Sequence, residues 1–289
     1  MKKLQETASV LEHEPVARQT FRLRLHSPGI ARSATAGQFA MIQVREGVDP
    51  LLRRPLSFHR LFPGEGCIEF LYRVVGRGTW WLSRVRPGET VDLLGPLGNG
   101  FDVQDSAAYP VALIAGGIGI APLFQLVSRL LVTPLERERP EIHLFYGART
   151  ASELLPDHFL QSLGISSHVS TDDGTGGFHG RVTDMFQRAV GKETGEPRRV
   201  FACGPLAMQF HVARWVLARG IESQLSLEAL MACGVGACLG CALPAVSHHG
   251  RSAERYVHVC KDGPIFRAEA IQWTKVQAHP APPPSFLYS

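Results

Sequence analysis

The sequence predicts an α+β multidomain chain, with an N-terminal antiparallel β-barrel, a doubly wound α/β domain and a small C-terminal β appendage. Three observations predict this order. Short apolar runs bounded by Gly or Pro fill the first hundred residues, strands and helices alternate from about residue 110, and four cysteines gather between Cys233 and Cys260. A length of 289 residues is enough for two ordinary domains and an appendage.

The first part of the chain is expected to be a small antiparallel barrel over residues 1–101. Its apolar runs are short and rich in β-branched and aromatic residues, which is typical of strands in such a barrel. One short helix is expected near residues 79–84. The predicted strands are 38–44, 54–60, 67–75 and 89–96.

The second part, over residues 102–225, is expected to be a parallel sheet with helices on both faces. Strand and helix patterns alternate there, and this alternation is typical of doubly wound α/β domains. The predicted strands are 110–117, 141–149, 167–174 and 198–205, and residues 223–232 are expected to be a fifth strand with its exit toward the cysteines. The appendage is expected over 226–275, with strands at 242–246, 255–259 and 263–266, and a flexible Pro-rich tail over 276–289.

The cysteines of the appendage have a spacing that predicts a metal centre. Four intervening residues, then two, then eighteen separate the candidate ligands Cys233, Cys238, Cys241 and Cys260. A C-x4-C-x2-C run with a distant fourth Cys is the plant-type [2Fe–2S] spacing. Glycines between the thiols allow the positive φ angles that a tightly curled loop needs. The spacing therefore favours a [2Fe–2S] cluster.

Two other uses of these cysteines remain open from spacing alone. Zinc sites usually combine two C-x2-C pairs or include His ligands, and three histidines lie nearby at positions 248, 249 and 258. Two disulfide bonds are the other alternative.

Two segments of the predicted barrel could hold a flavin. The first is Arg54-Pro55-Leu56-Ser57, where a guanidinium could bind a phosphate and a hydroxyl could bind a flavin ring atom. The second is Leu71-Tyr72-Arg73, which leads into a glycine turn and the start of a helix at Gly78 and Thr79. Free N–H groups there would favour an anion. The alternatives are an edge strand with a solvated Arg and a plain turn with Thr79 as N-cap, but the two segments together favour a flavin pyrophosphate.

A glycine turn follows the first strand of the α/β domain, where such folds bind dinucleotides. Its candidate residues are Gly116, Gly117 and Gly119. The alternative is a glycine-rich turn that merely packs tightly. Cys203 ends the fourth strand and is a candidate neighbour of a nicotinamide, or else a buried structural thiol. Asp172 and Asp173, after the third strand, could bind ribose hydroxyls or cap the turn.

Composition and charge exclude several classes of function. The net charge of +4 contains no clustered basic run, so no nucleic-acid partner is expected. No window holds 18 uninterrupted apolar residues, so no membrane span is expected, and the first fifteen residues lack a signal-peptide core. Six cysteines with a cluster spacing are typical of a reducing compartment, which predicts a cytoplasmic protein.

With these motifs in hand, the chain resembles the electron-transfer subunits of type 1B dihydroorotate dehydrogenases, within the ferredoxin–NADP reductase superfamily. The resemblance covers roughly residues 5–275. It rests on RPLS, LYR with GRGT, GPLGNGF, GGIGIAP, FYGART, TDDG with RVTD, ACGPLAM, CGVGACLGC and VCKDGPIF, in that order. Leu56 stands where the superfamily usually has Tyr. All four candidate ligands are Cys, whereas a related ferredoxin–NADP oxidoreductase subunit has an Asp among them.

The resemblance implies an oxidoreductase subunit that transfers electrons in pyrimidine (UMP) biosynthesis. An FMN-containing catalytic subunit would oxidise dihydroorotate, and electrons would pass through [2Fe–2S] and FAD in this chain to NAD+. The resemblance also implies a heterotetramer with two copies of each subunit. The alternative is an iron–sulfur flavoprotein subunit of another NAD(P)H-linked oxidoreductase, of ferredoxin–NADP reductase or hydrogenase type. The implied FAD contacts are Arg54, Pro55, Leu56, Ser57, Leu71, Tyr72, Arg73, Gly78 and Thr79.

Two further expectations concern the chemistry. The sequence offers no general acid or base that this chain would need, so no catalytic residue for dihydroorotate oxidation is expected here. Arg149, after the second α/β strand, stands where an acidic ribose ligand would be sought, and an Arg near that point can accommodate a 2′-phosphate. The resemblance therefore implies NAD as the co-substrate, whereas the residue at position 149 does not indicate NAD.

Overall fold

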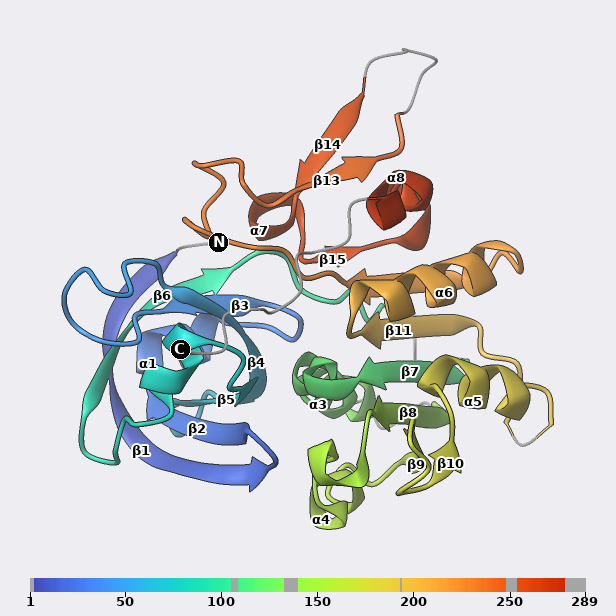
Figure 1. Cartoon of the computed structure of the whole chain (residues 1–289), viewed down its shortest axis with the longest axis horizontal. Coiled ribbons are helices and arrows are strands. Elements are labelled where there is room, and N and C mark those ends of the chain that lie inside the picture. The colour runs from blue at the N-terminus through green and yellow to red at the C-terminus, as the bar shows by residue number, and fades with distance from the viewer. Residues whose placement is uncertain (1–2, 105–108, 133–139, 193, 248–253, 279–289) are drawn as a thin grey trace.

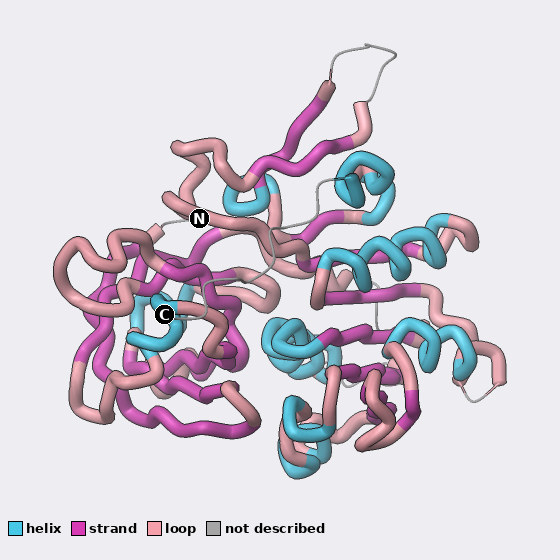
Figure 2. Tube along the Cα trace, viewed as in Figure 1, coloured by secondary structure: helices cyan, strands magenta, loops and turns pink. Residues whose placement is uncertain are grey.

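The structure is a computed structural model that describes residues 3–104, 109–132, 140–192, 194–247 and 254–278. Its ribbon consists of a barrel on one side, a layered α/β unit on the other and a two-stranded hairpin above them (Figure 1). Strands form the centres of all three parts, and most helices cover the larger sheet (Figure 2). This is the α+β architecture that the sequence predicts.

The barrel closes from six antiparallel strands in the order β1-β2-β5-β4-β3-β6, with β6 paired to β1. Alternate side chains of β5, such as Phe70 and Tyr72, fill its interior with Phe58 of β4. The first two strands were not delimited from the sequence, because β1 alternates exposed charged residues with few apolar ones. The elements are β1 (Leu4–Ala17), β2 (Thr20–His26), α1 (Pro28–Ser33), β3 (Phe39–Ile42), β4 (Arg54–Phe62), β5 (Cys67–Arg73), α2 (Arg77–Leu82) and β6 (Thr90–Leu97).

The larger sheet has the order β10-β9-β8-β7-β11-β12-β15, and every pair but the last is parallel. Helices α3 and α4 pack on one face and α5 and α6 on the other, as predicted for a doubly wound domain. The elements are β7 (Val111–Gly116), η2 (Gly117–Gly119), α3 (Ile120–Leu131), β8 (Ile142–Ala148), η3 (Ala151–Glu153), α4 (Asp157–Gln161), β9 (Ser166–Thr171), β10 (Phe178–His179), α5 (Val182–Ala189), β11 (Arg199–Cys203), α6 (Leu206–Leu217) and β12 (Glu222–Ser226).

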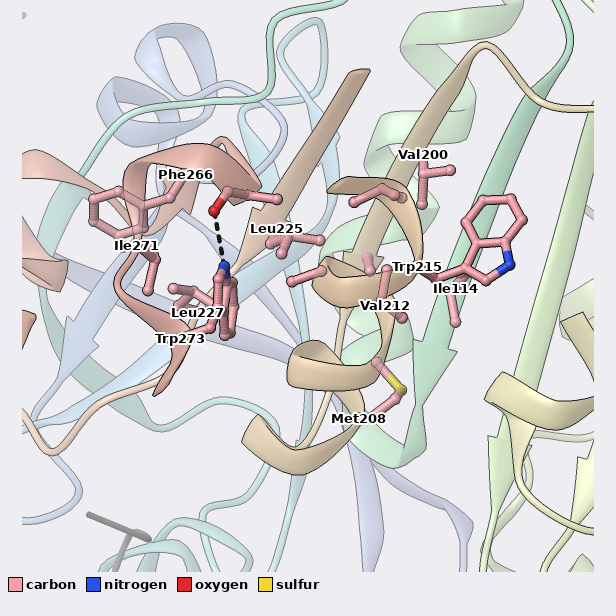
Figure 3. Packing of buried hydrophobic residues seen from close by; sticks show 14 of the residues in the cluster. Ile114, Val200, Met208, Val212, Trp215, Leu225, Leu227, Phe266, Ile271 and Trp273 are labelled. Carbon is pink, nitrogen blue, oxygen red and sulfur yellow. Dashed lines mark hydrogen bonds between the residues drawn. The ribbon is translucent and has the colours of Figure 1, made fainter. Parts of the chain in front are cut away.

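The C-terminal part folds back onto this sheet. Its elements are β13 (Ala242–Ala245), β14 (Arg255–His258), α7 (Val259–Asp262), β15 (Ile265–Phe266), η4 (Ala268–Ala270) and α8 (Trp273–Ala278). Figure 3 shows Trp273 and Ile271 beside Leu225 of β12, with the Trp273 indole N–H donating to the Ala268 carbonyl at 2.7 Å. Cys241 and Cys260 belong to the same buried cluster, so the cysteine loop is anchored in a core.

Two details of the predicted appendage are wrong. The segment 263–266 was expected within the appendage, but β15 joins the large sheet antiparallel to β12. Ile265 and Phe266 are buried there, because they cover the edge strand. The predicted tail was to begin at 276, but α8 continues to Ala278. The rest of that Pro-rich tail, 279–289, lies outside the described residues.

None of the helices in the described part of the chain is both long enough and apolar enough to cross a membrane.

Candidate functional site

The four candidate cluster cysteines form two pairs, one within the cysteine loop (residues 233–241) and one between this loop and α7. The Cys241 and Cys260 sulfurs lie 3.3 Å apart, and the Cys260 N–H points to the Cys241 sulfur at 3.4 Å. In the second pair, the Cys238 N–H points to the Cys233 sulfur at 3.4 Å. Gly234 and Gly236 take φ angles of +71° and +84°, which confirms that glycines allow the loop to curl.

This arrangement fits a binuclear cluster. A [2Fe–2S] centre has four protein ligands, two on each iron, and the thiols are already grouped two by two. In the described part of the chain, no three His, Cys, Asp or Glu side chains form a group that could hold a metal ion. The His258 Nδ1 atom lies 3.6 Å from Asp262 Oδ2. Positions 248 and 249 lie outside the described residues. The pairing therefore agrees with the iron–sulfur interpretation better than with the zinc alternative.

The loop's backbone stabilises negative charge on sulfur. Burial opposes ionisation of Cys233, but N–H groups of Cys238 and Val235 point at its sulfur and lower its pKa to about 6. Burial and the neighbouring Cys241 thiol raise the pKa of Cys260 to about 12. Iron binds thiolates, so a cluster would supply the positive charge that the buried pair lacks.

The segment after Cys260 is fixed to the barrel by Asn99, a residue that the sequence motifs did not indicate. Its N–H donates to the Gly263 carbonyl at 2.6 Å, and its side chain bonds both the N–H and the carbonyl of Ile265, at 2.9 Å each. A Cβ on Gly234 would lie 2.4 Å from Met41 of β3, so the loop and the barrel touch. The turn after β6 that contains Asn99 therefore also holds the chain next to the cluster cysteines.

The two predicted flavin segments come together at one place. Arg54, at the start of β4, lies against Gly78 in the first turn of α2, where an added Cβ would be 2.1 Å from the guanidinium Nε. The residue at position 78 must therefore be glycine for Arg54 to keep this place. Thr79 is not the N-cap: its hydroxyl accepts from the N–H groups of Val75 and Gly76, which leaves the next amides of the turn for an anion.

Other predicted flavin residues take different positions. Tyr72 points into the barrel, where its hydroxyl contacts His13 Nε2 at 2.7 Å and its ring stacks near Phe21, so only its backbone could contact a flavin. Burial raises the pKa of Tyr72 strongly. Leu71 faces the α/β domain. Pro55, Leu56 and Ser57 are partly exposed along β4.

Arg73 is held by a carboxylate that the sequence analysis missed. Glu153 of η3 receives Arg73 Nη2 at 2.6 Å, and it also binds Arg149, at 2.9 Å. Burial alone would raise the pKa of Glu153, but the hydrogen bonds from both arginines outweigh it and lower that pKa. A single Glu after a strand gives no signal for this role, since its partner lies 80 residues away in sequence.

The glycine turn contains two kinds of position. A Cβ on Gly119 would lie 2.2 Å from the Cys203 carbonyl oxygen, so this glycine allows η2 to pack against the end of β11. Gly116 is similarly crowded by Met208 and Pro205. Gly117 has a φ of +53° and no atom within 4 Å of its Cβ position. The tight-packing alternative thus applies to Gly116 and Gly119, while Gly117 alone borders open space.

Cys203 is buried, and burial raises the pKa of its thiol well above its usual range. The charge of Glu228 adds to this effect, and a hydrogen bond with Ser226 opposes it. The thiol therefore stays protonated at neutral pH. Ser226 and Glu228 were not identified from the sequence, although both lie at the carboxyl end of β12, where an α/β sheet binds its ligands.

The two aspartates after β9 differ in their contacts. The Asp173 carboxylate accepts from the N–H and hydroxyl of Thr175 at 3.0 and 2.6 Å, so it caps the turn. Among the described residues, no group bonds the Asp172 carboxylate, and this side chain is exposed at the ligand edge of the sheet. Of the two, Asp172 is the carboxylate available to a ribose.

Two family models match the chain. One, described as the iron–sulfur cluster binding domain of dihydroorotate dehydrogenase B, matches residues 228–272. The other, described as an oxidoreductase NAD-binding domain, matches residues 113–214. The first includes all four cysteines, and the second begins in β7 and ends in α6.

Solved structures share the fold. A structure of an NADH-dependent reduced ferredoxin–NADP oxidoreductase, described in the context of flavin-based electron bifurcation, is 28% identical with a TM-score of 0.78, covering 94% of this chain and 92% of that one. A ferredoxin–NADP+ reductase from Neisseria gonorrhoeae, with bound FAD and NADP, has a TM-score of 0.62 at 18% identity, covering 75% of this chain and 92% of that one. The latter shows the fold alone.

Curated relatives match over nearly the whole length. The electron transfer subunit of dihydroorotate dehydrogenase B (NAD(+)) from Desulforamulus reducens is 36% identical over 266 residues, which cover 92% of this chain and 97% of the relative. The protein of the same name from Bacillus caldolyticus is 37% identical, with 92% and 98% covered. This chain therefore belongs to the family of dihydroorotate dehydrogenase B electron transfer subunits.

Proposed function

We propose that the chain passes electrons from the FMN of a dihydroorotate dehydrogenase catalytic subunit, through a [2Fe–2S] cluster and FAD, to NAD+ in UMP biosynthesis. The observation that carries this is the paired set of four thiols beside a barrel that presents Arg54 next to Gly78, with Asn99 binding the segment after Cys260. A cluster there would lie against the flavin barrel within one chain. Family membership supports NAD+ as the acceptor, and the ferredoxin–NADP reductase or hydrogenase alternative is not favoured.

Each part of the chain has one task in this proposal. Residues 1–101 bind FAD through Arg54, Pro55, Leu56, Ser57, Leu71, Tyr72, Arg73, Gly78 and Thr79, with Tyr72 acting through its backbone. Residues 102–225 bind the nicotinamide dinucleotide near Gly116, Gly117, Gly119 and Cys203. Residues 226–275 hold the cluster on Cys233, Cys238, Cys241 and Cys260. When bound, FAD can exchange one or two electrons, which joins one-electron and two-electron chemistry.

The chain's own residues contribute binding and orientation. Arg54 and the α2 amides offer positive charge to a pyrophosphate. The backbone of Cys203 packs against Gly119 of the glycine turn, and its buried thiol stays protonated. None of these residues needs to exchange a proton with dihydroorotate, which we assign to the partner subunit.

We further propose that the partner docks on the loop around Cys238 and Leu239, in a heterotetramer with two copies of each subunit. Cys238 is exposed, Leu239 is 58% exposed, and Leu230 in the same loop is 75% exposed. Leu239 also has a φ of +60°, an uncommon conformation for a residue other than glycine. Electron transfer needs a short distance, so the partner should cover the exposed cluster ligand.

A comparison of the lone chain with the co-expressed pair tests the proposed function. We expect the pair to reduce NAD+ with dihydroorotate and the lone chain to show no such activity, because the donor FMN is absent. Leu239→Glu should raise the dissociation constant between the two subunits at least tenfold, since it puts a charge in an apolar contact. Titration measures this constant, and size-exclusion chromatography shows the loss of the complex. Val132→Glu is the control, because Val132 is 83% exposed beyond the far end of α3. A fully active lone chain would exclude this function.

NADH should bind more tightly than NADPH. The exposed carboxylate of Asp172 would accept a ribose hydroxyl and repel a 2′-phosphate. Arg149 offers less charge to such a phosphate than its exposure suggests, because Glu153 binds it. Stopped-flow reduction of the FAD at varied NADH and NADPH gives both dissociation constants. Asp172→Asn should reduce the ratio of the NADPH to the NADH dissociation constant about tenfold. Asp157→Asn, which changes an exposed carboxylate on α4, should leave this ratio unchanged. Equal dissociation constants for NADH and NADPH in the unaltered chain would refute the prediction.

A further inference from the structure

One buried carboxylate joins the barrel to the α/β domain. The Glu153 side chain is 7% exposed and binds two guanidiniums with both oxygens. Arg73 Nη2 and Nη1 lie 2.6 and 3.0 Å from Oε1 and Oε2, and Arg149 Nη2 and Nε lie 2.9 and 3.3 Å from the same two atoms. Arg73 ends β5 of the barrel, whereas Glu153 and Arg149 follow β8 of the sheet.

The contact stands where the two domains meet at the ligand edge of the sheet. Next to Glu153, the Ser152 carbonyl accepts the N–H of Arg18, in the turn between β1 and β2, at 2.9 Å. Tyr146 of β8 holds the end of the segment that contains η3, because its buried hydroxyl accepts the Leu155 N–H at 3.3 Å. The short segment η3 thus touches the barrel at two points and is itself fixed to β8.

A second contact between the domains runs along β4 and α3. The N–H of Leu61 donates to Gln125 of α3 at 2.8 Å, and Arg60 donates to Ser162 after α4 at 2.8 Å. These contacts involve the far half of β4, away from Arg54. The Asn99 bonds to Ile265 of β15 form a third link between the barrel and the sheet. Of these three links, the Glu153 contact is the one at η3, directly after β8, where the carboxyl ends of the strands face the ligand crevice.

We propose that Glu153 is a positioning residue that sets the angle between the nicotinamide-binding domain and the flavin barrel for hydride transfer. The inference rests on the proposed function, since it requires FAD on the barrel and a nicotinamide on the sheet. Hydride transfer depends steeply on the approach of the two rings, and a shift of about 1 Å can cost about a hundredfold in rate. Glu153 would act through this geometry and not by touching either ring.

Glu153→Gln in the assembled holoenzyme tests the proposal. The amide keeps the size and loses the charge that holds both arginines. We expect the limiting rate of FAD reduction by NADH, in anaerobic stopped flow, to fall about 10- to 100-fold. The dissociation constant for NADH should change less than about threefold, because the dinucleotide contacts stay on the sheet. The nicotinamide–flavin charge-transfer band, which reports ring stacking, should weaken in parallel.

Two variants separate this role from folding and from ligand binding. Arg149→Gln removes the exposed arginine and leaves the Arg73–Glu153 pair, so its limiting rate should stay within about threefold of the unaltered enzyme. Glu153→Asp keeps the charge on a shorter side chain, so its limiting rate of FAD reduction should lie between those of the unaltered enzyme and Glu153→Gln. Equal losses in Glu153→Gln and Arg149→Gln would overturn the proposal. So would a weaker NADH affinity at an unchanged rate, which would assign Glu153 to binding.

Hydrogen exchange provides a readout that does not depend on electron transfer. In Glu153→Gln, the Arg18 amide should exchange about tenfold faster, because its bond to Ser152 depends on the closed contact. The Leu61 amide at the β4–α3 contact should be unchanged. If NADH fails to reduce the unaltered enzyme, the proposed function is wrong, yet faster exchange at Arg18 would still support the domain contact. Unchanged exchange at Arg18 would reject the contact itself.

Discussion

Replacing Cys241 by serine should remove the iron–sulfur cluster while leaving the flavin in place. Cys241 is 3% exposed, and its sulfur lies 3.3 Å from that of Cys260. A hydroxyl is a poor ligand for iron compared with a thiolate, and the loop has no free cysteine to replace it. We expect iron to fall from about two atoms per FAD to nearly none, and the broad cluster absorbance that dithionite bleaches to disappear.

The functional consequence follows from the proposed order of electron transfer. Electrons from the partner would no longer reach NAD+, so dihydroorotate-dependent NAD+ reduction should fall at least a hundredfold. Reduction of the FAD by NADH, followed with ferricyanide as acceptor, should stay within about twofold, because Arg54, Gly78 and Gly117 are untouched. Parallel loss of both activities would show that the cluster region is needed for flavin binding as well.

Cys67→Ser is the matched control. Cys67 is also buried and free, but it lies on β5 and belongs to no cysteine pair. Its serine variant should keep the full iron content and the cluster spectrum. Zinc in place of iron in the unaltered protein, or two irons retained in Cys241→Ser, would contradict the assignment of these ligands.

Local spacing explains why the cluster ligands could be predicted from the sequence. Cys233, Cys238 and Cys241 lie within nine residues, so any loop that curls there brings them together, and the intervening glycines indicate such a loop. The strand–helix alternation was equally local, and it correctly predicted helices on both faces of the large sheet. These features depend on short-range backbone geometry, which sequence patterns carry directly.

Long-range contacts were the part that the sequence could not predict. The residues around Asn99 do not indicate its partners, which lie more than 160 residues further along the chain. Glu153 likewise gains its role from Arg73 across the domain boundary. Strand β15 was assigned to the appendage because two residues carry no periodicity, and only the exposed edge of β12 decides where they pair.

The direction in which each side chain points was a further property that the sequence could not predict. Tyr72 belongs to a flavin motif by resemblance, yet strand alternation directs its ring into the barrel, while Leu71 and Arg73 face outward. The glycines of the βα turn were treated as one set, but the structure distinguishes crowded Gly119 from open Gly117. Such differences depend on neighbours from other elements, and spacing within one segment does not contain them.

Arg54→Gln should weaken FAD binding about 10- to 100-fold, which corresponds to the loss of a charge-assisted hydrogen bond. Arg54 is partly buried, and burial lowers its pKa. No carboxylate among the described residues lies within 4 Å of its guanidinium, which donates to the backbone carbonyls of Leu52 and Arg53. A partly desolvated cation without a counter-ion, beside the free amides of α2, is what an anionic pyrophosphate would stabilise.

The measurement is the FAD dissociation constant from reconstitution of the apoprotein, followed by quenching of flavin fluorescence. Arg53→Gln is the matched control, since Arg53 precedes it on the chain and its Nη2 pairs with Asp92 at 2.5 Å. That variant should bind FAD normally but lose some stability. Arg54→Gln should do the reverse, because removing an unpaired, partly buried charge relieves the apoprotein of a desolvation cost. An apoprotein melting temperature that falls in Arg54→Gln, with FAD affinity unchanged, would assign Arg54 to the barrel's own stability and remove it from the flavin site.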